Sequence, residues 1–316
     1  MAQTNCNQMK KILFILTYLS LLSAVDYAGY SGSFLRLGTT ARSVAMGSAF
    51  TAAIDDAFAA YHNPAGTAFM DSPRVSVIHH SMPLDRRLTA SGFAMKLPPT
   101  AGVSLAFLQT ATTNIDGRTQ AGQQTDMLTT SEMAAYIGFA QRIMPWLSFG
   151  INIKIMYQYL PLNQEKIRGN GTGIDVGILV KLPKERTLGF TVQDLNSGYH
   201  WDTSKILENG SADNVNKFPV ITRLGASLPV KMLFVTADAG VVTGGKTYLA
   251  STFRFGAEFP YKENYFLRAG YGNNRLAVGV GMKYRFRNPG DAAIDYSAAV
   301  DASGGLNHIF TFAFKL

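Results

Sequence analysis

The sequence has little charge and almost no cysteine. Charged residues make up 16% of its 316 residues, whereas soluble domains usually contain about 25%. The single cysteine, Cys6, lies near the N-terminus, ahead of an apolar stretch. If that N-terminal segment is removed, the rest of the chain has no thiol, which excludes disulfide bonds and thiolate chemistry.

Long apolar runs are also absent from most of the chain. A transmembrane helix needs about 20 apolar residues, and no stretch after residue 28 approaches that length. Residues 12–22 are apolar, but they follow Lys10 and Lys11 and precede small residues, which is the pattern of a secretory signal peptide. We expect residues 1–28 to be such a signal, with the cleavage site left open; a membrane-anchoring helix is the alternative. If the rest of the chain enters a membrane, it does so with strands.

The charge that is present is basic, with a formal net charge of +8. The basic residues are scattered along the chain, and an exported chain rarely meets nucleic acid, so we expect no nucleic-acid partner. Acidic lipid headgroups are the more natural neighbour for such a surface.

Instead, the chain shows alternation of apolar and polar residues. Residues 148–159 read SFGINIKIMYQY, with an apolar residue at every second position from Phe149 to Tyr159. Asn152 and Lys154 fall on the opposite face. Strict alternation is the pattern of a strand whose two faces meet different solvents.

Fourteen such runs follow one another from residue 72 onward. Most contain about 9–11 residues, which is enough for a tilted strand to cross a bilayer. The approximate spans are 72–81, 88–97, 101–110, 131–141, 146–158, 173–182, 186–194, 219–228, 232–242, 248–259, 264–272, 275–286, 291–298 and 306–316.

The connections between these runs alternate in length. The gaps after even-numbered runs are short and each contains a proline, whereas the gaps after odd-numbered runs are mostly longer and polar, notably 111–130, 159–172 and 195–218. Short turns at one rim and long loops at the other are typical of outer-membrane barrels. With an even number of strands, both ends of the sheet lie on the short-turn side, so the sheet can close on itself.

The sequence therefore predicts an all-β fold, in which residues 72–316 form a 14-stranded antiparallel transmembrane β-barrel in the bacterial outer membrane. A soluble β-sandwich or β-helix is the alternative, because one face of its strands also alternates. The signal sequence, the aromatic-rich alternation and the alternating loop lengths together favour the barrel. Lipid then surrounds the apolar face, and the sheet must close because an open edge in lipid leaves unpaired amides.

Polar and charged residues on the opposite face are expected to point into a wet barrel interior. Mixed charges there could define a pore field, but we favour bracing of an internal plug, because buried charges need partners. The predicted lumen-facing residues are Asn152, Lys154, Gln158, Arg223, Asp238, Arg254, Glu258, Arg268, Lys283 and Arg285.

Residues 29–71 do not alternate and are rich in alanine and other small residues. We expect two short helices there, one after Thr40 that ends near Gly47, and one from Asp55 or Asp56 that ends at the turn 63–66. Such short helices do not stand alone, and a 14-stranded cylinder is too wide to be filled by its own wall side chains. Residues 29–71 are therefore predicted to form an N-terminal hatch inside the barrel.

The same segment carries a family resemblance. Its motifs are Phe34-Leu35, Ala41-Arg42, Ala45-Met46-Gly47, Asp55-Asp56 and Asn63-Pro64-Ala65-Gly66. Together they resemble the N-terminal signature of the PorV/PorQ outer-membrane proteins, which are related to the FadL-type long-chain fatty acid transporters. The resemblance implies a 14-stranded barrel with an N-terminal hatch. The hatch motif residues that it implies are Arg42, Met46, Gly47, Asp55, Asp56, Asn63, Pro64, Ala65 and Gly66.

The resemblance also implies a function without catalysis. PorV-type members take part in type IX protein secretion as carriers or docking partners of exported proteins, and FadL-type members pass hydrophobic molecules through the outer membrane. Because the signature is nearer to PorV/PorQ, we expect a secretion-associated carrier or docking protein, with FadL-like transport as the alternative. The expected partners are outer-membrane lipids, secreted proteins or secretion-system components, and hydrophobic small molecules.

Motifs for catalysis or cofactor binding are weak. Residues 240–247 match the phosphate-loop pattern, but an alternating strand follows where the loop needs a helix, so a glycine-rich hairpin is favoured. His79 and His80 are adjacent on a strand, point to opposite faces and cannot share one metal. The pair Asp55-Asp56 could act in acid–base catalysis, but a helix cap is favoured. We expect no enzyme, no cofactor and no metal; a barrel hydrolase remains as an alternative.

Overall fold

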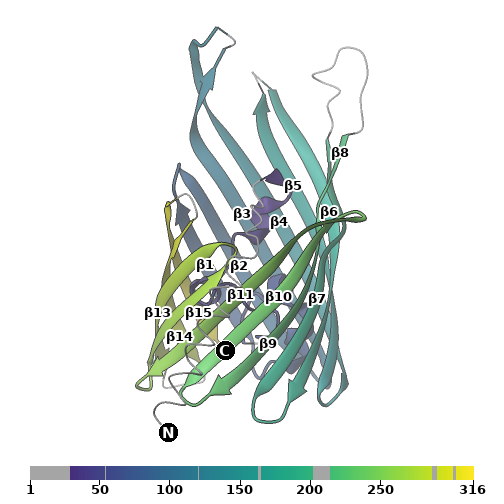
Figure 1. The fold of residues 1–316 in the computed structure, drawn as a ribbon, viewed down its shortest axis with the longest axis vertical. Coiled ribbons are helices and arrows are strands. Elements are labelled where there is room, and N and C mark those ends of the chain that lie inside the picture. The colour runs from purple at the N-terminus through teal and green to yellow at the C-terminus, as the bar shows by residue number, and fades with distance from the viewer. Residues whose placement is uncertain are drawn as a thin grey trace, which may run out of the picture.

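The computed structural model describes residues 29–316, apart from residues 54, 120, 163–164, 202–213, 287–289 and 302–303. The signal segment that we predict over residues 1–28 lies outside the described residues. Four short helical segments come first in the described chain, and strands make up nearly all of the rest (Figure 1). The helical segments are η2 (Ser33–Arg36), α2 (Ala41–Ala45), α3 (Ala59–His62) and η3 (Pro64–Phe69).

The strands form one antiparallel sheet. Their bounds are β1 (Arg74–Met82), β2 (Arg86–Leu97), β3 (Ala101–Arg118), β4 (Gln124–Met144), β5 (Leu147–Leu162), β6 (Glu165–Leu182), β7 (Arg186–Trp201), β8 (Asn214–Lys217), β9 (Val220–Val230), β10 (Leu233–Gly244), β11 (Thr247–Tyr261), β12 (Tyr265–Gly272), β13 (Arg275–Arg285), β14 (Asp291–Val300) and β15 (Leu306–Lys315).

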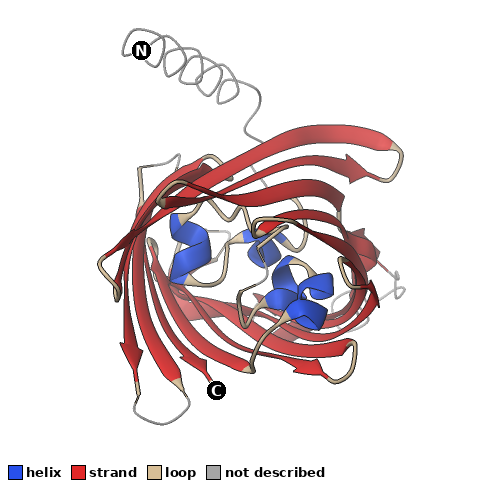
Figure 2. Cartoon of the chain, turned by 90° about the horizontal axis from the view of Figure 1, so that it is seen from below, coloured by secondary structure: helices blue, strands red, loops and turns tan. Residues whose placement is uncertain are grey.

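The sheet closes on itself, which confirms the predicted 14-stranded barrel. The first strand pairs with the last, from Arg74 opposite Lys315 to Ser81 opposite His308. Strands β8 and β9 both pair with β7, so they act as two parts of one barrel strand that is interrupted at residues 218–219. Every other neighbour in the barrel is also a neighbour in the chain. Seen from below, the strands form a ring around the helical segments (Figure 2).

The two faces of the wall differ as the alternation predicts. On β5, Ile153 is 53% exposed on the outside of the barrel, whereas Asn152 is fully buried and Lys154 is 2% exposed on the inside. The outward side chains of the other strands are also mostly large and apolar, among them Phe139, Phe190 and Phe312. An apolar outer face is stable only against lipid, and the ladder that runs around the ring leaves few amides unpaired there.

The predicted long loops are mostly strand, which corrects the sequence prediction. Residues 111–130 belong largely to β3 and β4, and residues 159–172 belong largely to β5 and β6. Part of 195–218 also lies in β7 and β8, while residues 202–213 lie outside the described residues. Above a membrane both faces of a strand meet water, so the apolar alternation disappears although the backbone pairing continues. The result is a tall wall at β3–β7 that rises above the opposite side of the barrel (Figure 1).

The hatch differs in detail from the predicted pair of helices. The first helix, α2, follows Thr40, whose side-chain oxygen accepts a hydrogen bond from the Ser43 amide. The second helix does not begin at the acidic pair, because Asp56 accepts a hydrogen bond from the Phe58 amide in a turn and α3 starts only at Ala59. The predicted turn at 63–66 instead opens the 3₁₀-helix η3, with the Asn63 side chain accepting from the Ala65 amide.

Glycines on the inner wall let the hatch approach closely. A Cβ atom added at Gly150 on β5 would lie 2.4 Å from the backbone nitrogen of Ala65. A Cβ atom at Gly256 on β11 would lie 2.4 Å from the backbone oxygen of Met46. Both distances are far below van der Waals contact, so the hatch backbone occupies the space that a larger wall residue would need. Inward glycines thus explain part of the high glycine content of the chain, which is 30 residues.

Candidate functional site: the barrel lumen and its hatch

The barrel interior is partly apolar where β1, β2, β3 and β15 face the hatch, which corrects the expectation of a wet interior. Five large side chains from β1, β2, β3 and β15 point inward and are at most 7% exposed. They belong to one cluster with Phe34 and Val44 of the hatch. The five residues, which we call the upper apolar cluster, are Ile78, Met82, Leu88, Leu108 and Ile309. They lie at the level of the first part of the hatch, because Ile78 is opposite Thr311, whose hydroxyl accepts from the Ala41 amide.

A buried charge network ties η2 of the hatch to the wall at β5–β7. The Nζ of Lys154 lies 2.7 Å from Oδ1 of Asp175 and also contacts Asp194. An Nη of Arg36 lies 3.3 Å from Oδ2 of the same Asp194. All four side chains are under 5% exposed. Charges this deep persist only when they are paired, because removing one partner leaves an uncompensated charge in a poorly solvated place.

A second network ties α2 to the wall at β11–β14. Arg42 donates two hydrogen bonds to the carboxylate of Glu258, at 2.8 and 2.9 Å. Glu258 also accepts from Arg268 at 2.6 Å, and Arg268 donates in turn to Asp295 at 2.5 Å. Burial alone would lower the pKa of Arg42, but the Glu258 carboxylate beside it raises that pKa above its ordinary value. Two-pronged pairing of this kind fixes the orientation of a guanidinium group as well as its position.

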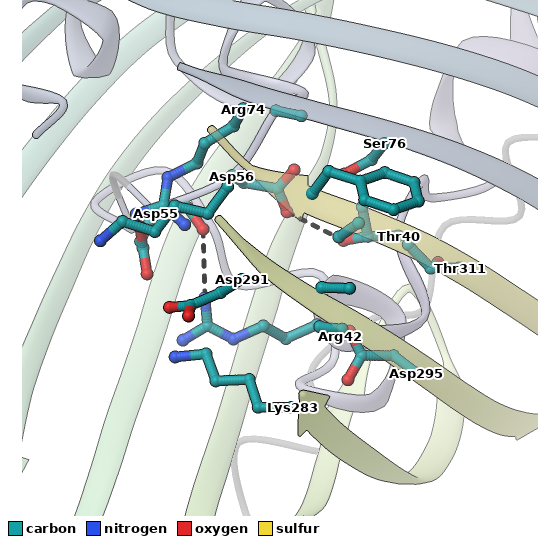
Figure 3. Close-up of a pocket in the computed structure, with 16 residues that line it drawn as sticks. Thr40, Arg42, Asp55, Asp56, Arg74, Ser76, Lys283, Asp291, Asp295 and Thr311 are labelled. Carbon is teal, nitrogen blue, oxygen red and sulfur yellow. Dashed lines mark hydrogen bonds and ion pairs between the residues drawn. The ribbon is translucent and has the colours of Figure 1, made fainter. Parts of the chain in front are cut away.

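The third group of charges surrounds a pocket at the rim of short turns (Figure 3). The pocket holds about 70 Å³ between the hatch loop at 55–57 and strands β1 and β13–β15. Arg74 pairs with Asp55 and lies 3.0 Å from Asp71, which Lys315 also contacts at 2.6 Å. Partial burial opposes ionisation of Asp71, but Lys315 and Arg74 hold its pKa well below the ordinary value. The lower end of the hatch is therefore clamped to the first and last strands together.

The buried member of the acidic pair lines the same pocket. Asp56 accepts hydrogen bonds from the Thr40 hydroxyl at 2.9 Å and from the Phe58 amide at 2.8 Å. Burial raises the pKa of Asp56 above its ordinary value. Its oxygens serve the fold of the hatch, and Asp55 is engaged with Arg74. Both carboxylates therefore support the fold and attachment of the hatch.

Polar wall side chains hold the remainder of the hatch backbone. Asp238 accepts from both the amide and the hydroxyl of Thr51, at 3.2 and 2.8 Å. Arg254 donates to the Ser48 carbonyl at 3.1 Å and, with Arg223, lines a small polar cavity between the hatch and the wall. Further wall-to-hatch bonds join Ser148 to Ala65, Asn152 to Ala60 and Thr187 to Ala52. These bonds satisfy carbonyl groups that a helix-poor segment cannot satisfy itself.

Most of the ten predicted lumen residues lie where alternation places them. Seven are buried inside the barrel: Asn152, Lys154, Arg223, Asp238, Arg254, Glu258 and Arg268. Gln158 is half-buried on β5, and Lys283 is exposed but lines the pocket of Figure 3. The placement of Arg285 in the lumen is wrong, because its side chain is 86% exposed below the short-turn rim, 3.8 Å from Asp291. Strand β13 runs past the end of the lumen there, so alternation no longer separates inside from outside.

The hatch motif residues fall into three groups. Arg42, Asp55 and Asp56 take part in the charge contacts described above. Met46 and Gly47 press against the inner faces of β11 and β12. In the last group, Asn63 donates to the carbonyls of Thr51 and Ile178, and Pro64, Ala65 and Gly66 form the start of η3.

Sequence reasoning missed several charged partners. Asp175 and Asp295 occupy inward positions of predicted strands, so alternation could have found them. Asp194 lies in a bulge of β7, where φ is +65° and the alternation breaks. Arg36 lies in the hatch, where no periodic pattern indicates direction. The consequence is that the lumen contains more paired acids than the sequence indicates.

Within the described residues, no group of three or more histidine, cysteine, aspartate or glutamate side chains is arranged to hold a metal. His80 is buried and His79 faces outward, as their adjacent places on β1 require. Residues 240–247 form the end of β10, a tight turn and the start of β11. None of the helices in the described part of the chain has the length and apolar character to span a bilayer.

A closed barrel with an apolar outer face and an internal hatch defines a bacterial outer-membrane barrel of the FadL-type fold. Three solved structures support this class. The toluene transporter TodX of Pseudomonas putida superimposes with a TM-score of 0.61 at 14% identity, over 88% of this chain and 97% of that one. The toluene transporter TbuX of Ralstonia pickettii gives 0.57 at 14%, over 88% and 98%. A FadL homologue of Pseudomonas aeruginosa gives 0.58 at 11%, over 88% and 98%.

Comparisons of the sequence say less about function than the comparisons of structure. The model of an uncharacterised protein family, UPF0164, matches residues 28–176, which include the hatch and the first strands. No curated protein matches the chain in sequence. At identities of 11–14% the structural likeness shows the fold alone. The specific resemblance to PorV/PorQ has no counterpart among these matches.

Proposed function

We propose that this protein is a conduit for hydrophobic small molecules across the outer membrane. The supporting observation is the upper apolar cluster, whose inward side chains line the part of the wall that packs against the hatch. A water-filled pore has polar walls, whereas apolar side chains at this place would bind apolar solutes and exclude ions. The similar structures include transporters of toluene, so a monoaromatic hydrocarbon is the natural first substrate to test.

Passage requires the hatch to move. The cluster is closely packed against Phe34 and Val44 of the hatch, and its side chains are at most 7% exposed. Hydrogen bonds and ion pairs hold the hatch at η2, α2 and Thr51, so a solute passes only when some of these contacts open. The hatch is thus the barrier, and the apolar cluster is the binding surface that the hatch covers.

A reversible lock tests this function. The chain has no cysteine after Cys6, so two introduced cysteines form the only pair in the mature barrel. Thr51→Cys with Asp238→Cys would join hatch to wall, because the two native side chains lie 2.8 Å apart. Cells that express the locked barrel should take up radiolabelled toluene at the background rate, and a reductant should restore uptake.

The control lock lies within the wall. Val77→Cys with Ser91→Cys joins β1 to β2, where the two residues are directly opposite on the outer face, and leaves the contacts of the hatch in place. Uptake through this variant should equal uptake through the unmodified barrel. Equal uptake with the hatch locked or free, or no uptake above cells without the protein, contradicts the conduit.

A second candidate function is the carrier or docking role for exported proteins that the PorV/PorQ signature implies. The observation that favours it is the tall wall, in which β3–β6 continue far beyond the length that a membrane requires. Such hairpins present polar backbone and side chains to large partners. Affinity capture from native outer membrane, with mass spectrometry of proteins and lipids, separates the two functions: secretion components would support this role, and their absence alongside retained hydrophobic solutes would contradict it.

A further inference from the structure

Three guanidinium groups line the small polar cavity that lies between the hatch and the wall. They belong to Arg36 of η2, Arg223 of β9 and Arg254 of β11. Each of these residues is at most 7% exposed. The cavity holds about 20 Å³, and none of the described residues that line it is acidic. Positive charge therefore surrounds a space of nearly atomic size.

Arg223 has a neutral partner where a buried cation needs an anion. Within the described residues, the one hydrogen bond that its side chain makes goes to the side-chain oxygen of Gln193, which is uncharged. Its Nε atom is buried and has no hydrogen-bond partner. A buried charge is costly unless an opposite charge and hydrogen bonds compensate it. The surroundings of Arg223 therefore favour a negatively charged occupant of the cavity.

Two carboxylates interact with the charge of Arg223 from outside the cavity, those of Asp194 and Asp238. Asp194 is engaged in the charge network of η2 described above. Asp238 accepts two hydrogen bonds from Thr51 with one oxygen, and its other oxygen lies against Gly225 of the wall. Both acids therefore offset the positive charge around the cavity only in part.

His62 of the hatch shows the effect of these charges. Its imidazole ring also lines the cavity. Burial, and then the charges of Arg254 and Arg223, lower the pKa of His62 to about 3. The ring is therefore neutral at neutral pH, and it adds a polar group to the cavity without a further positive charge. An environment that disfavours a cation in this way favours an anion.

Volume and hydrogen bonding limit what can occupy the cavity. One water molecule needs roughly 10–15 Å³, so a cavity of about 20 Å³ accommodates one water or one monatomic ion. A water molecule also needs acceptors for its two hydrogens. The side-chain oxygens of Gln193 and Asn273 line the cavity, but they already accept from Arg223 and Arg254. An anion needs donors alone, and guanidinium groups supply them.

We propose that this cavity binds one small inorganic anion of the size of chloride. The ion contacts Arg36 on the hatch and both Arg223 and Arg254 on the wall, in addition to the contacts that these arginines make within the chain. Because its ligands come from both parts, bound anion stabilises the closed position of the hatch. This inference does not depend on the conduit, since the cavity is present in the closed barrel whatever the barrel transports.

The test follows thermal unfolding of the full chain in detergent micelles while sodium gluconate is replaced by sodium chloride at constant ionic strength. Gluconate is too large for the cavity, so chloride alone should stabilise the protein, and the effect should saturate. The unfolding midpoint should rise by about 3 °C once chloride exceeds its dissociation constant about tenfold. Arg223→Gln should lose most of this rise, because it removes a positive charge from the cavity, and Arg223→Lys should keep part of it.

The matched control is Arg285→Gln, which removes a cation that is exposed below the lumen and should keep the full rise. A second measurement needs no variant. Crystals of the native chain grown in sodium bromide should show an anomalous peak within hydrogen-bond distance of Arg223. A water molecule in the cavity of these crystals, equal midpoints in gluconate and chloride, or a chloride response that a folded Arg223→Gln retains in full overturns the proposal.

Discussion

Lys154 on β5 and Asp175 on β6 form an ion pair of 2.7 Å inside the barrel wall, with both side chains at most 2% exposed. The two residues are offset along the ladder by two positions, because Asn152 lies directly opposite Asp175 and Lys154 lies opposite Gly173. Lys154 also contacts Asp194, which binds Arg36 of the hatch. The lysine thus stabilises the pairing of three wall strands and the attachment of the hatch together.

Replacement of this lysine should destabilise the barrel strongly. Lys154→Met leaves two buried carboxylates with one fewer cation, and the loss of one partner of a buried pair costs about 3–5 kcal/mol. The midpoint of heat-modifiable unfolding in gels measures the effect. A second change, Asp175→Asn, removes one of the two carboxylates that lack a cation and should restore part of the lost stability. If the double variant is less stable than Lys154→Met alone, the network does not act as described.

Replacement of Arg42 should loosen the hatch while the barrel stays intact. Arg42→Met removes two hydrogen bonds to Glu258, and Arg268 remains to compensate that carboxylate. We expect more frequent openings to ions in planar bilayers, by about tenfold if the loss is near 1.4 kcal/mol. Arg285→Met is the control, because that side chain is exposed below the lumen. Similar conductance for the two variants would show that the Arg42–Glu258 contact does not hold the barrier.

Acidification should weaken the hatch through His62. Burial, followed by the charges of Arg254 and Arg223, lowers the pKa of His62 to about 3. Because this is below the ordinary value of about 6.5, the unfolded chain binds the proton first as pH falls. Stability is therefore full above about pH 6.5 and decreases between there and about pH 3.

The measurement is the unfolding midpoint at pH 7 and at pH 4.5, compared between the native chain and His62→Gln. Glutamine keeps a polar group near the Thr39 hydroxyl, which lies 3.0 Å from Nε2 of His62, but it does not titrate in this range. The variant should lose less stability on acidification than the native chain. An identical pH response would assign the effect to other groups.

Closing the space at an inner-wall glycine should displace the hatch. A Cβ atom at Gly150 meets the backbone of residues 64–65 at 2.4–2.8 Å, and backbone cannot turn aside as a side-chain end can. Gly150→Val should therefore lower the unfolding midpoint and raise protease cleavage within residues 29–71. Gly122→Ala is the control for the loss of a glycine: its φ of +79° strains the exposed turn, but nothing lies within 4 Å of a Cβ atom there, so the hatch is not displaced. Equal protease sensitivity in the two variants would contradict close packing of the hatch.

The fold could be predicted because its dominant signal is local. Period-two alternation marks each strand that separates lipid from the interior, as in 148–159, and the even strand count allows closure. The hatch was recognisable by its lack of alternation and its small residues. The ends of its two α-helices agree with the prediction. The start of the second was missed, because Asp56 accepts from the Phe58 amide in a turn and α3 begins only at Ala59.

The lumen was harder to predict than the wall. On β1, Val77 is 50% exposed and its neighbour Ile78 is 1% exposed, so apolar residues occupy both faces and alternation cannot assign the inner one. The upper apolar cluster was therefore missed. The tall hairpins were missed because strands with water on both sides carry no apolar period, and Asp194 was missed because a bulge shifts the period where it lies.

The clamp at the lower rim has a consequence for biogenesis. Asp71, which ends the hatch, is held by Lys315 of the final strand, and β15 zips onto β1 beside it. Closure of the barrel between β1 and β15 and attachment of the hatch therefore depend on the same final strand. A truncated chain that lacks β15 can neither close the barrel nor attach the hatch through Asp71. Such incomplete chains should therefore be degraded before they form open pores in the membrane.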